Sequence, residues 1–264
     1  MKVNRNINLS FAAILIFGAS VLTACSKDDD EEVLGVDTTS RVDKYKEMES
    51  LIESQPFSLL QGVSVGNAQD NDAKTGVTVF FFPQASMASA VVLGGGPASR
   101  EVPLLDPQRN TQPLNALVFS GGSAYGLAAS DGVANCLEEH GNGYDTGFGL
   151  VPIVCQSCIL DLSYGNGNVR PDREMGYKAC QNAIAANSPL SGNVGAGTGA
   201  TVGKPSGMAS AQKSGIGYAI SHSSGDVQSD VNTIGVLASL VMEKAIADAI
   251  LSSKIPDEEY LSNI

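Results

Sequence analysis

The sequence has no tryptophan and only two histidines, His140 and His222, which lie far apart along the chain. Neither belongs to an H-x-H or H-x-x-x-H pair, so no histidine-rich metal site is predicted. Positive charge is also scarce, because 16 Lys and Arg residues face 28 Asp and Glu residues, for a net charge of −12. Since nucleic-acid binding neutralises phosphates with cations, this balance argues against a nucleic-acid partner.

The chain does contain enough apolar sequence for a folded core. Its 264 residues are 43% hydrophobic and 17% charged, which at about 150 residues per domain allows one large domain or two small ones. Glycine is frequent, at 29 residues, without a period of three that would indicate collagen. We therefore expect many tight turns or close approaches between backbone segments.

The N-terminus has the pattern of an exported lipoprotein. Lys2 and Arg5 precede an apolar stretch over residues 11–22, which suits a secretory signal but is too short to span a bilayer. Residues 22–25 (LTAC) resemble a bacterial lipobox, in which the cysteine, here Cys25, is lipidated and becomes the mature N-terminus. A plain signal peptide with an incidental cysteine is the alternative.

An acidic run, SKDDDEE, follows at residues 26–32 and is expected to stay solvated and extended. It resembles acidic export tags that send lipoproteins to the outer cell surface, although a generic linker would look the same. We predict a lipoprotein signal peptide over 1–24, an acidic tether over 25–40 and one folded domain over 41–264. The predicted location is the outer membrane or cell surface, with a lipid anchor in the membrane.

Four cysteines lie in the folded domain, and an oxidising compartment would permit disulfides between them. Cys155 and Cys158 form a C-x-x-C motif, but one such pair is weak evidence for zinc and lacks a thioredoxin-like context. Together with Cys136 and Cys180, they are interpreted as buried or loosely paired, and their pairing stays open.

Hydrophobic periodicity predicts an α/β domain. Strands are expected at 63–67, 76–82, 88–93 and 114–119, with Pro83 ending the second. Helices are expected at 41–54, 123–139, 173–186 and 233–253, with Ser123 as an N-cap and Gly141 as a C-terminal stop. Because the strands come in an early group, a layered α/β or α+β sandwich is favoured over a doubly wound sheet.

A glycine-rich loop over residues 191–207 invites comparison with phosphate-binding loops. The P-loop pattern needs glycine where Thr198 stands and Ser or Thr where Pro205 stands. The dinucleotide fingerprint fits residues 195–200 loosely, but no convincing strand precedes them. Nucleotide binding is therefore the least favoured hypothesis.

Several longer motifs occur in a fixed order: LNALVFSGGSAYGL at 114–127, VPIV at 151–154, RP at 170–171, GY at 176–177, the glycine loop at 192–204 and KSGIG at 213–217. In this order and spacing they resemble the P1 family of peptidases. That family includes L-aminopeptidase/D-esterase, β-aminopeptidase and nylon-oligomer hydrolase enzymes. The resemblance covers about residues 58–222.

The resemblance implies a four-layer αββα sandwich of the N-terminal-nucleophile-like aminopeptidase type. It implies an aminopeptidase, or an amide or ester hydrolase, that acts on small peptides or amides without a cofactor or metal, and a homo-oligomer. In this family the precursor cuts its own chain before a Ser or Thr. The freed α-amine, with a pKa of about 8, can act as the base for the adjacent hydroxyl, so no histidine is needed.

The resemblance also gives roles to particular residues. The candidate self-cleavage site is the Asn232–Thr233 bond, and Thr233 would be the nucleophile. Lys204 matches a lysine that would steer protons or stabilise negative charge near the nucleophile, with an exposed loop lysine as the alternative. Ser123, Tyr125 and Asn193 are assigned to substrate binding.

A second alignment, which we favour, matches residues 225–250 to the closing helix of the family. Thr233 would then cap or begin a structural helix. A segment would be absent between about His222 and Gly225, including a V-N-A strand, the true cleavage site and a D-G-D motif. The sandwich would be incomplete and would expose apolar surface and strand edges. The alternative function is an inactive relative that acts as a surface-binding lipoprotein.

Overall fold

The computed structural model describes residues 13–18, 60–94, 96–106, 108–109, 113–185, 192–201, 214–221 and 231–252. The helix expected at 41–54 and the acidic tether lie outside these residues. Among the described helices, none is long and apolar enough to cross a membrane.

The described chain forms nine strands, three α-helices and three short 3-10 helices. The strands are β1 (Ala13–Gly18), β2 (Ser64–Asp70), β3 (Thr75–Gly94), β4 (Ser99–Arg100), β5 (Leu114–Ser120), β6 (Tyr144–Asp145), β7 (Leu150–Val151), β8 (Val154–Cys158) and β9 (Ser214–Ser221). The helices are η2 (Val102–Leu105), η3 (Ser123–Ala128), α2 (Ala129–Glu139), α3 (Arg173–Ile184), η4 (Gly195–Gly197) and α4 (Val231–Ser252).

Strand β3 is one long strand that belongs to two sheets. Its first half pairs antiparallel with β2 and β5, and its second half pairs antiparallel with β9. The register with β5 shifts between Phe81 and Ser86, and Ala85 has a positive φ of 46°. The prediction that Pro83 ends a strand is therefore wrong. Proline removes one N–H donor from the ladder, and the strand continues beyond it through an irregularity.

The remaining strands complete the two sheets. In the first, β5 pairs parallel with β8, which pairs antiparallel with β4. In the second, β9 pairs antiparallel with β1. The strands predicted at 63–67 and 114–119 are confirmed as β2 and β5, whereas those at 76–82 and 88–93 are the two halves of β3.

The first sheet lies between two hydrophobic cores. The first core lies between the first sheet and the helices α2 and α3, and it contains Val77, Val79 and Phe81 of β3. The second core lies between the two sheets, and it contains Phe82 of β3 and Tyr218 of β9. Strand β5 is buried along its whole length because its neighbouring side chains alternate between the two cores.

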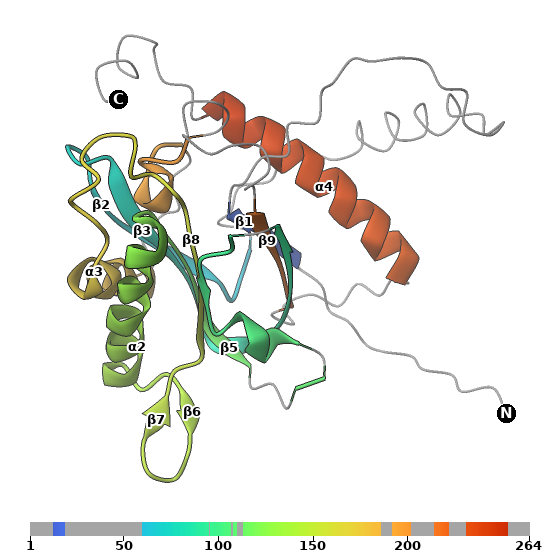
Figure 1. Cartoon of the computed structure of the whole chain (residues 1–264). Helices are drawn as coiled ribbons and strands as arrows, with labels where there is room; N and C mark the ends of the chain where they lie inside the picture. Colours follow the sequence, from blue (N-terminus) through green and yellow to red (C-terminus); the bar gives the residue numbers. More distant parts are fainter. Residues whose placement is uncertain are drawn as a thin grey trace, which may run out of the picture.

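Helix α4 lies against β1 and so adds an outer layer on the second sheet. The layers run from α2 and α3 through the two sheets to α4 (Figure 1). The predicted four-layer αββα arrangement is therefore confirmed. The helix predicted at 233–253 is also confirmed, and it buries Leu240.

The apolar stretch of the predicted export signal contributes strand β1. Residues Ala13–Gly18 (AILIFG) pair with β9 along their whole length, from Ala13 opposite Ser221 to Gly18 opposite Ile216. Isoleucine and phenylalanine suit an extended strand, so the same apolar residues fit both a signal peptide and a sheet edge. Removal of residues 1–24 stays a prediction, and it would leave this side of β9 without a neighbour.

Helices α2 and α3 pack closely because each presents a glycine to the other. A Cβ atom at Gly132 would collide with the carbonyl oxygen of Arg173. A Cβ atom at Gly176 would collide with the carbonyl oxygen of Ala129. Helix α3 is capped at its N-terminus by Asp172, whose side chain accepts a hydrogen bond from the Met175 N–H at 2.9 Å.

Replacing Gly132 with alanine is expected to destabilise the protein by about 1–3 kcal/mol, because the new methyl group meets a backbone carbonyl that cannot move by itself. Urea unfolding followed by circular dichroism measures the change. Gly235→Ala in α4 is the matched control. Gly235 is exposed and a Cβ there meets nothing within 4 Å, so alanine should stabilise by about 0.5–1 kcal/mol. Equal effects of the two variants would contradict the close packing of α2 on α3.

Candidate active site

The candidate site is built on the sharp turn that follows β5. Gly122 and Ser123 have positive φ angles of 79° and 54°, which only glycine adopts without strain. Ser123 is not the predicted N-cap, since it stands inside η3, which precedes α2. Its backbone N–H instead donates to the carbonyl of Ile159 at 2.9 Å. Gly141, with a φ of 73°, does follow the end of α2 as predicted.

The side chain of Asp161 fixes this turn through hydrogen bonds. Its Oδ1 accepts the Gly122 N–H at 2.6 Å, and its Oδ2 accepts the Thr75 hydroxyl at 2.7 Å. A Cβ atom at Gly121 would collide with the same carboxylate. Burial raises the pKa of Asp161, and the two hydrogen bonds oppose this shift. Sequence analysis missed this residue, whose signal is a lone acid in the apolar run ILDL.

The glycine loop reaches the same carboxylate from another direction. A Cβ atom at Gly199 would lie 3.1 Å from the Cβ of Asp161 and would collide with the Lys74 carbonyl. Asn193 stands half-buried at the start of this loop. The structure therefore brings the two glycine-rich motifs of the sequence together around Asp161.

In the described part of the glycine loop, residues 192–201, several backbone N–H groups donate to other groups of the protein. The Gly195 N–H donates to Gln69 Oε1 at 2.6 Å, and the Ala196 N–H donates to the Thr78 hydroxyl at 3.0 Å. The Gly197 and Thr198 N–H groups donate to carbonyls within the loop. A phosphate cradle needs such donors to face a ligand, so the geometry of residues 195–198 argues against a phosphate-binding loop at these positions.

Tyr125 is an exposed side chain of the turn, with 61% of its surface accessible. The Arg170 guanidinium carbon lies 3.7 Å from the centre of its ring, a cation–π geometry. Arg170 Nε donates to the Gly167 carbonyl at 2.8 Å, which fixes the guanidinium over the ring. The turn thus presents a phenol hydroxyl and a cation side by side.

The two cysteines of the C-x-x-C motif lie in different surroundings. Cys155 lies in the second core and donates to the Glu101 carbonyl at 3.4 Å, whereas Cys158 contacts the Ser120 hydroxyl at 3.3 Å. Burial raises the pKa of Cys155 to about 12 and that of Cys158 to about 11, so both are thiols at neutral pH. Within the described ranges, no group of three metal-binding side chains occurs.

The remaining predicted residues do not join this site in the described structure. Asn232 and Thr233 stand in the first turn of α4, and Thr233 is exposed. That helix lies on the second sheet, on the other side of the layers from α2 and α3 (Figure 1). This placement agrees with the alignment in which Thr233 begins a structural helix. Lys204 and Cys25 lie outside the described residues.

Comparison with known proteins decides the family. The model of Peptidase family S58 matches residues 60–254. The chain belongs to peptidase family S58. This confirms the resemblance to the P1 peptidases, and the match includes the β5 turn, Asp161, the glycine loop and α4.

Curated relatives of this chain are named as an aminopeptidase and as an oligomer endohydrolase. An "Uncharacterized aminopeptidase" of Mycobacterium tuberculosis is 43% identical over 185 residues, covering 67% of this chain and 50% of its own. A "6-aminohexanoate-oligomer endohydrolase" of a Kocuria species is 32% identical over 143 residues, covering 54% and 38%. The chain therefore spans about half the length of the curated relatives it matches.

A solved L-aminopeptidase D-Ala-esterase/amidase of Ochrobactrum anthropi aligns with 55% of this chain and 44% of its own. Its identity is 19% and its TM-score 0.44, a likeness too low to support an argument.

Replacing Asp161 with alanine is expected to destabilise the protein by about 1–3 kcal/mol for each buried donor left without an acceptor. Those donors are the Gly122 N–H and the Thr75 hydroxyl. Chemical unfolding at neutral pH measures the loss. Asp145→Ala is the control, because Asp145 accepts a backbone N–H in the same way on the exposed β6–β7 hairpin, where a change within about 0.5 kcal/mol is expected. Equal losses would show that Asp161 does not hold the turn.

Proposed function

We propose that this protein is an aminopeptidase-type hydrolase that cleaves amide or ester bonds of small peptides or amides. The observation that carries the proposal is the S58 match over residues 60–254, which spans the whole described site. The names of the matched relatives support the same reaction class. The β5 turn, which hydrogen bonds to Asp161 and Ile159 hold in place, supplies the rigid platform that such chemistry needs.

In this proposal, Tyr125 and Arg170 bind the substrate. The phenol hydroxyl of Tyr125 is a donor that can reach a carbonyl oxygen, and the Arg170 cation over its ring favours negative charge nearby. The turn before Tyr125 is fixed by hydrogen bonds to Asp161 and Ile159, and Arg170 lies over the Tyr125 ring. Preorganised donors of this kind stabilise the oxyanion that forms when a carbonyl is attacked.

The nucleophile in the proposal is Thr233, freed by cleavage of the Asn232–Thr233 bond. Its hydroxyl would attack the substrate carbonyl, its own α-amine would accept the proton, and Lys204 would stabilise the charge that develops. Cleavage would also release the helix from the chain that precedes it. The first turn of α4 would then have to come next to the β5 turn, in the same protomer or across an oligomer.

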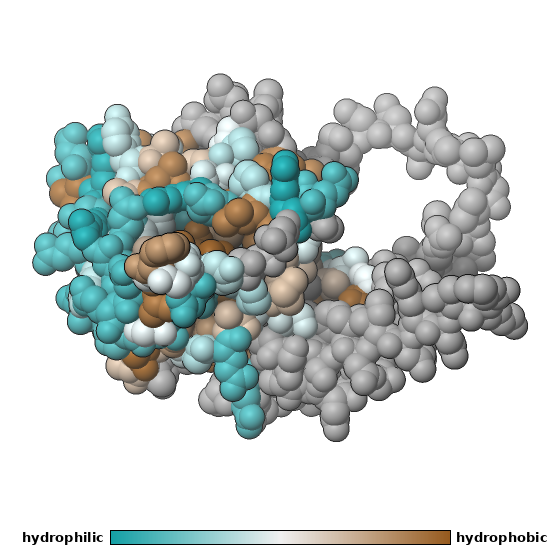
Figure 2. Space-filling view, turned by 90° about the horizontal axis from the view of Figure 1, so that it is seen from below, coloured by the Kyte–Doolittle hydropathy of each residue, from teal (hydrophilic) through white to brown (hydrophobic). Residues whose placement is uncertain are grey.

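A second candidate function is a catalytically inactive relative that binds a partner at the cell surface. Two observations favour it. Thr233 stands in a regular helix, and the β6–β7 hairpin exposes Tyr144, Phe148 and Val151. The view from below shows hydrophobic residues standing among hydrophilic ones on this side of the molecule (Figure 2). Exposed apolar groups of this kind mark interaction surfaces.

The intact mass of the full chain, after incubation at neutral pH, separates the two functions. Cleavage between Asn232 and Thr233 is expected to give two fragments and hydrolysis of amino-acid p-nitroanilides. Thr233→Ala should stop the cleavage and lower the hydrolysis rate by roughly 10⁴-fold or more. Ser239→Ala is the control, because it removes a hydroxyl from the same helix and should change neither. An uncut chain, with Thr233→Ala behaving as wild type, would leave the inactive relative as the function.

We also propose that the protein is a lipoprotein anchored through Cys25. In bacteria fed a labelled fatty acid, the wild-type chain should carry the label and appear in the membrane fraction. Two membrane-binding groups, such as two acyl chains, anchor a protein stably in a bilayer. Cys25→Ser should remove the label, whereas Cys155→Ser should keep it. A labelled Cys25→Ser chain would refute the anchor without bearing on the hydrolase.

A further inference from the structure

The packing of α2 on α3 repeats one spacing in both helices. In α2 the contact glycine Gly132 is followed four residues later by Cys136, and in α3 Gly176 is followed four residues later by Cys180. Positions four residues apart lie on the same face of a helix. The two glycines bring the backbones together, and the next turn of each helix therefore places one cysteine opposite the other.

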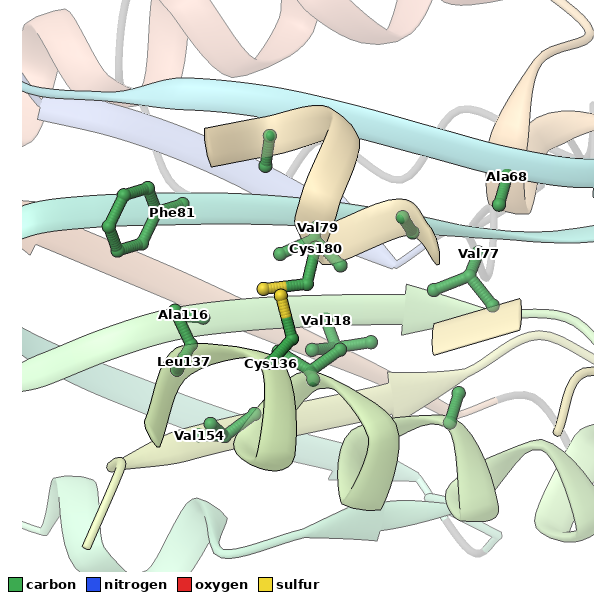
Figure 3. Close-up of a cluster of buried hydrophobic side chains, with 14 residues drawn as sticks. Ala68, Val77, Val79, Phe81, Ala116, Val118, Cys136, Leu137, Val154 and Cys180 are labelled. Carbon is green, nitrogen blue, oxygen red and sulfur yellow. The ribbon is translucent and has the colours of Figure 1, made fainter. Parts of the chain in front are cut away.

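The two thiols meet inside the first core. Both cysteines have no exposed surface, and their sulfur atoms point toward one another among Val79, Ala116 and Val118 (Figure 3). The two side chains are hydrogen-bonded to each other. Apart from His140, which lies near Cys136, the buried side chains around the pair in this core are apolar.

The pair is chemically asymmetric. The hydrogen bond from Cys180 and the nearby His140 lower the pKa of Cys136, whereas the same bond and burial raise the pKa of Cys180. His140 Nδ1 lies 4.0 Å from Cys136 Sγ and 2.7 Å from the Cys136 carbonyl oxygen, one turn further along α2. Cys136 is thus the more readily ionised thiol of the pair and would be the first to attack a disulfide. Cys180 would react second.

We propose that Cys136 and Cys180 are a disulfide site that joins α2 to α3. The oxidant is an organic disulfide such as glutathione disulfide, which meets the chain while it folds. The Cys136 thiolate attacks one glutathione sulfur, and the first glutathione leaves as a thiolate. The Cys180 thiolate then attacks the Cys136 sulfur of the mixed disulfide and releases the second glutathione. Two cysteine thiols are oxidised, one glutathione disulfide is reduced, and both thiol protons pass to the glutathione thiolates.

The C-x-x-C motif does not compete for this role. Cys155 and Cys158 are three residues apart on strand β8, so their side chains point to opposite faces of the sheet. Their different partners, the second core for Cys155 and the Ser120 hydroxyl for Cys158, agree with this separation. A bridge between them would require β8 to leave the sheet.

The test uses the full-length chain, reduced and unfolded, then refolded with glutathione disulfide or with a thiol reductant. Free thiols are alkylated, and the protein is digested and mapped by mass spectrometry. We expect one linked peptide pair that joins Cys136 to Cys180 and loses the mass of two hydrogen atoms. Cys136→Ala should abolish the link, whereas the matched buried-cysteine control Cys155→Ala should keep it.

Thermal unfolding supplies a second readout. The oxidised chain should melt roughly 5–10 °C higher than the reduced chain, because the bridge restricts the unfolded state. The difference should vanish in Cys180→Ala and persist in Cys155→Ala. Alkylation of both Cys136 and Cys180 after refolding with glutathione disulfide, or a link through Cys155 or Cys158, would overturn the proposal. The peptide map of the wild-type chain decides this even where a variant fails to fold.

Discussion

The structure depends on the continuity of β3 across the two sheets. Because successive side chains of a strand point to opposite faces, Phe81 enters the first core and Phe82 enters the second. The register shift that follows lets the strand leave β5 and pair with β9. A single run of 20 residues thus aligns both sheets and both cores, and the candidate site stands beside its first residue, Thr75.

The parts of the fold that the sequence could predict are those set by local pattern. The apolar run at β5, the alternation in the first half of β3 and the periodicity of α2, α3 and α4 correspond to the observed elements. The prediction that Pro83 ends a strand fails because proline interrupts only one hydrogen bond of the ladder. The strands that pair with β3 before and after Pro83 keep it extended. Tertiary pairing of this kind has no local signal.

The residues of the candidate site likewise fall into those that the sequence could predict and those that it could not. The GGSAYG turn and the glycine loop could be picked out from the sequence because glycine marks backbone that a side chain would obstruct. Asp161 could not, since its role comes from bonds to Gly122 and Thr75, far away along the chain. The opposition of Cys136 and Cys180 was equally hidden, because it needs the crossing of two helices that are separated by β6, β7 and β8.

The six residues of β1 pair with β9 in the structure, whereas the proposed export signal would take them out of the mature protein. Ala13 pairs with Ser221, so the ribosome must make nearly all of the chain before the partner strand exists. Pairing between residues this distant in sequence forms slowly. An N-terminal apolar segment, in contrast, is accessible to the secretion machinery as soon as it leaves the ribosome. Under the proposed export, secretion would therefore begin before β1 can pair with β9, whereas a chain that keeps residues 13–18 pairs them with β9 along their whole length.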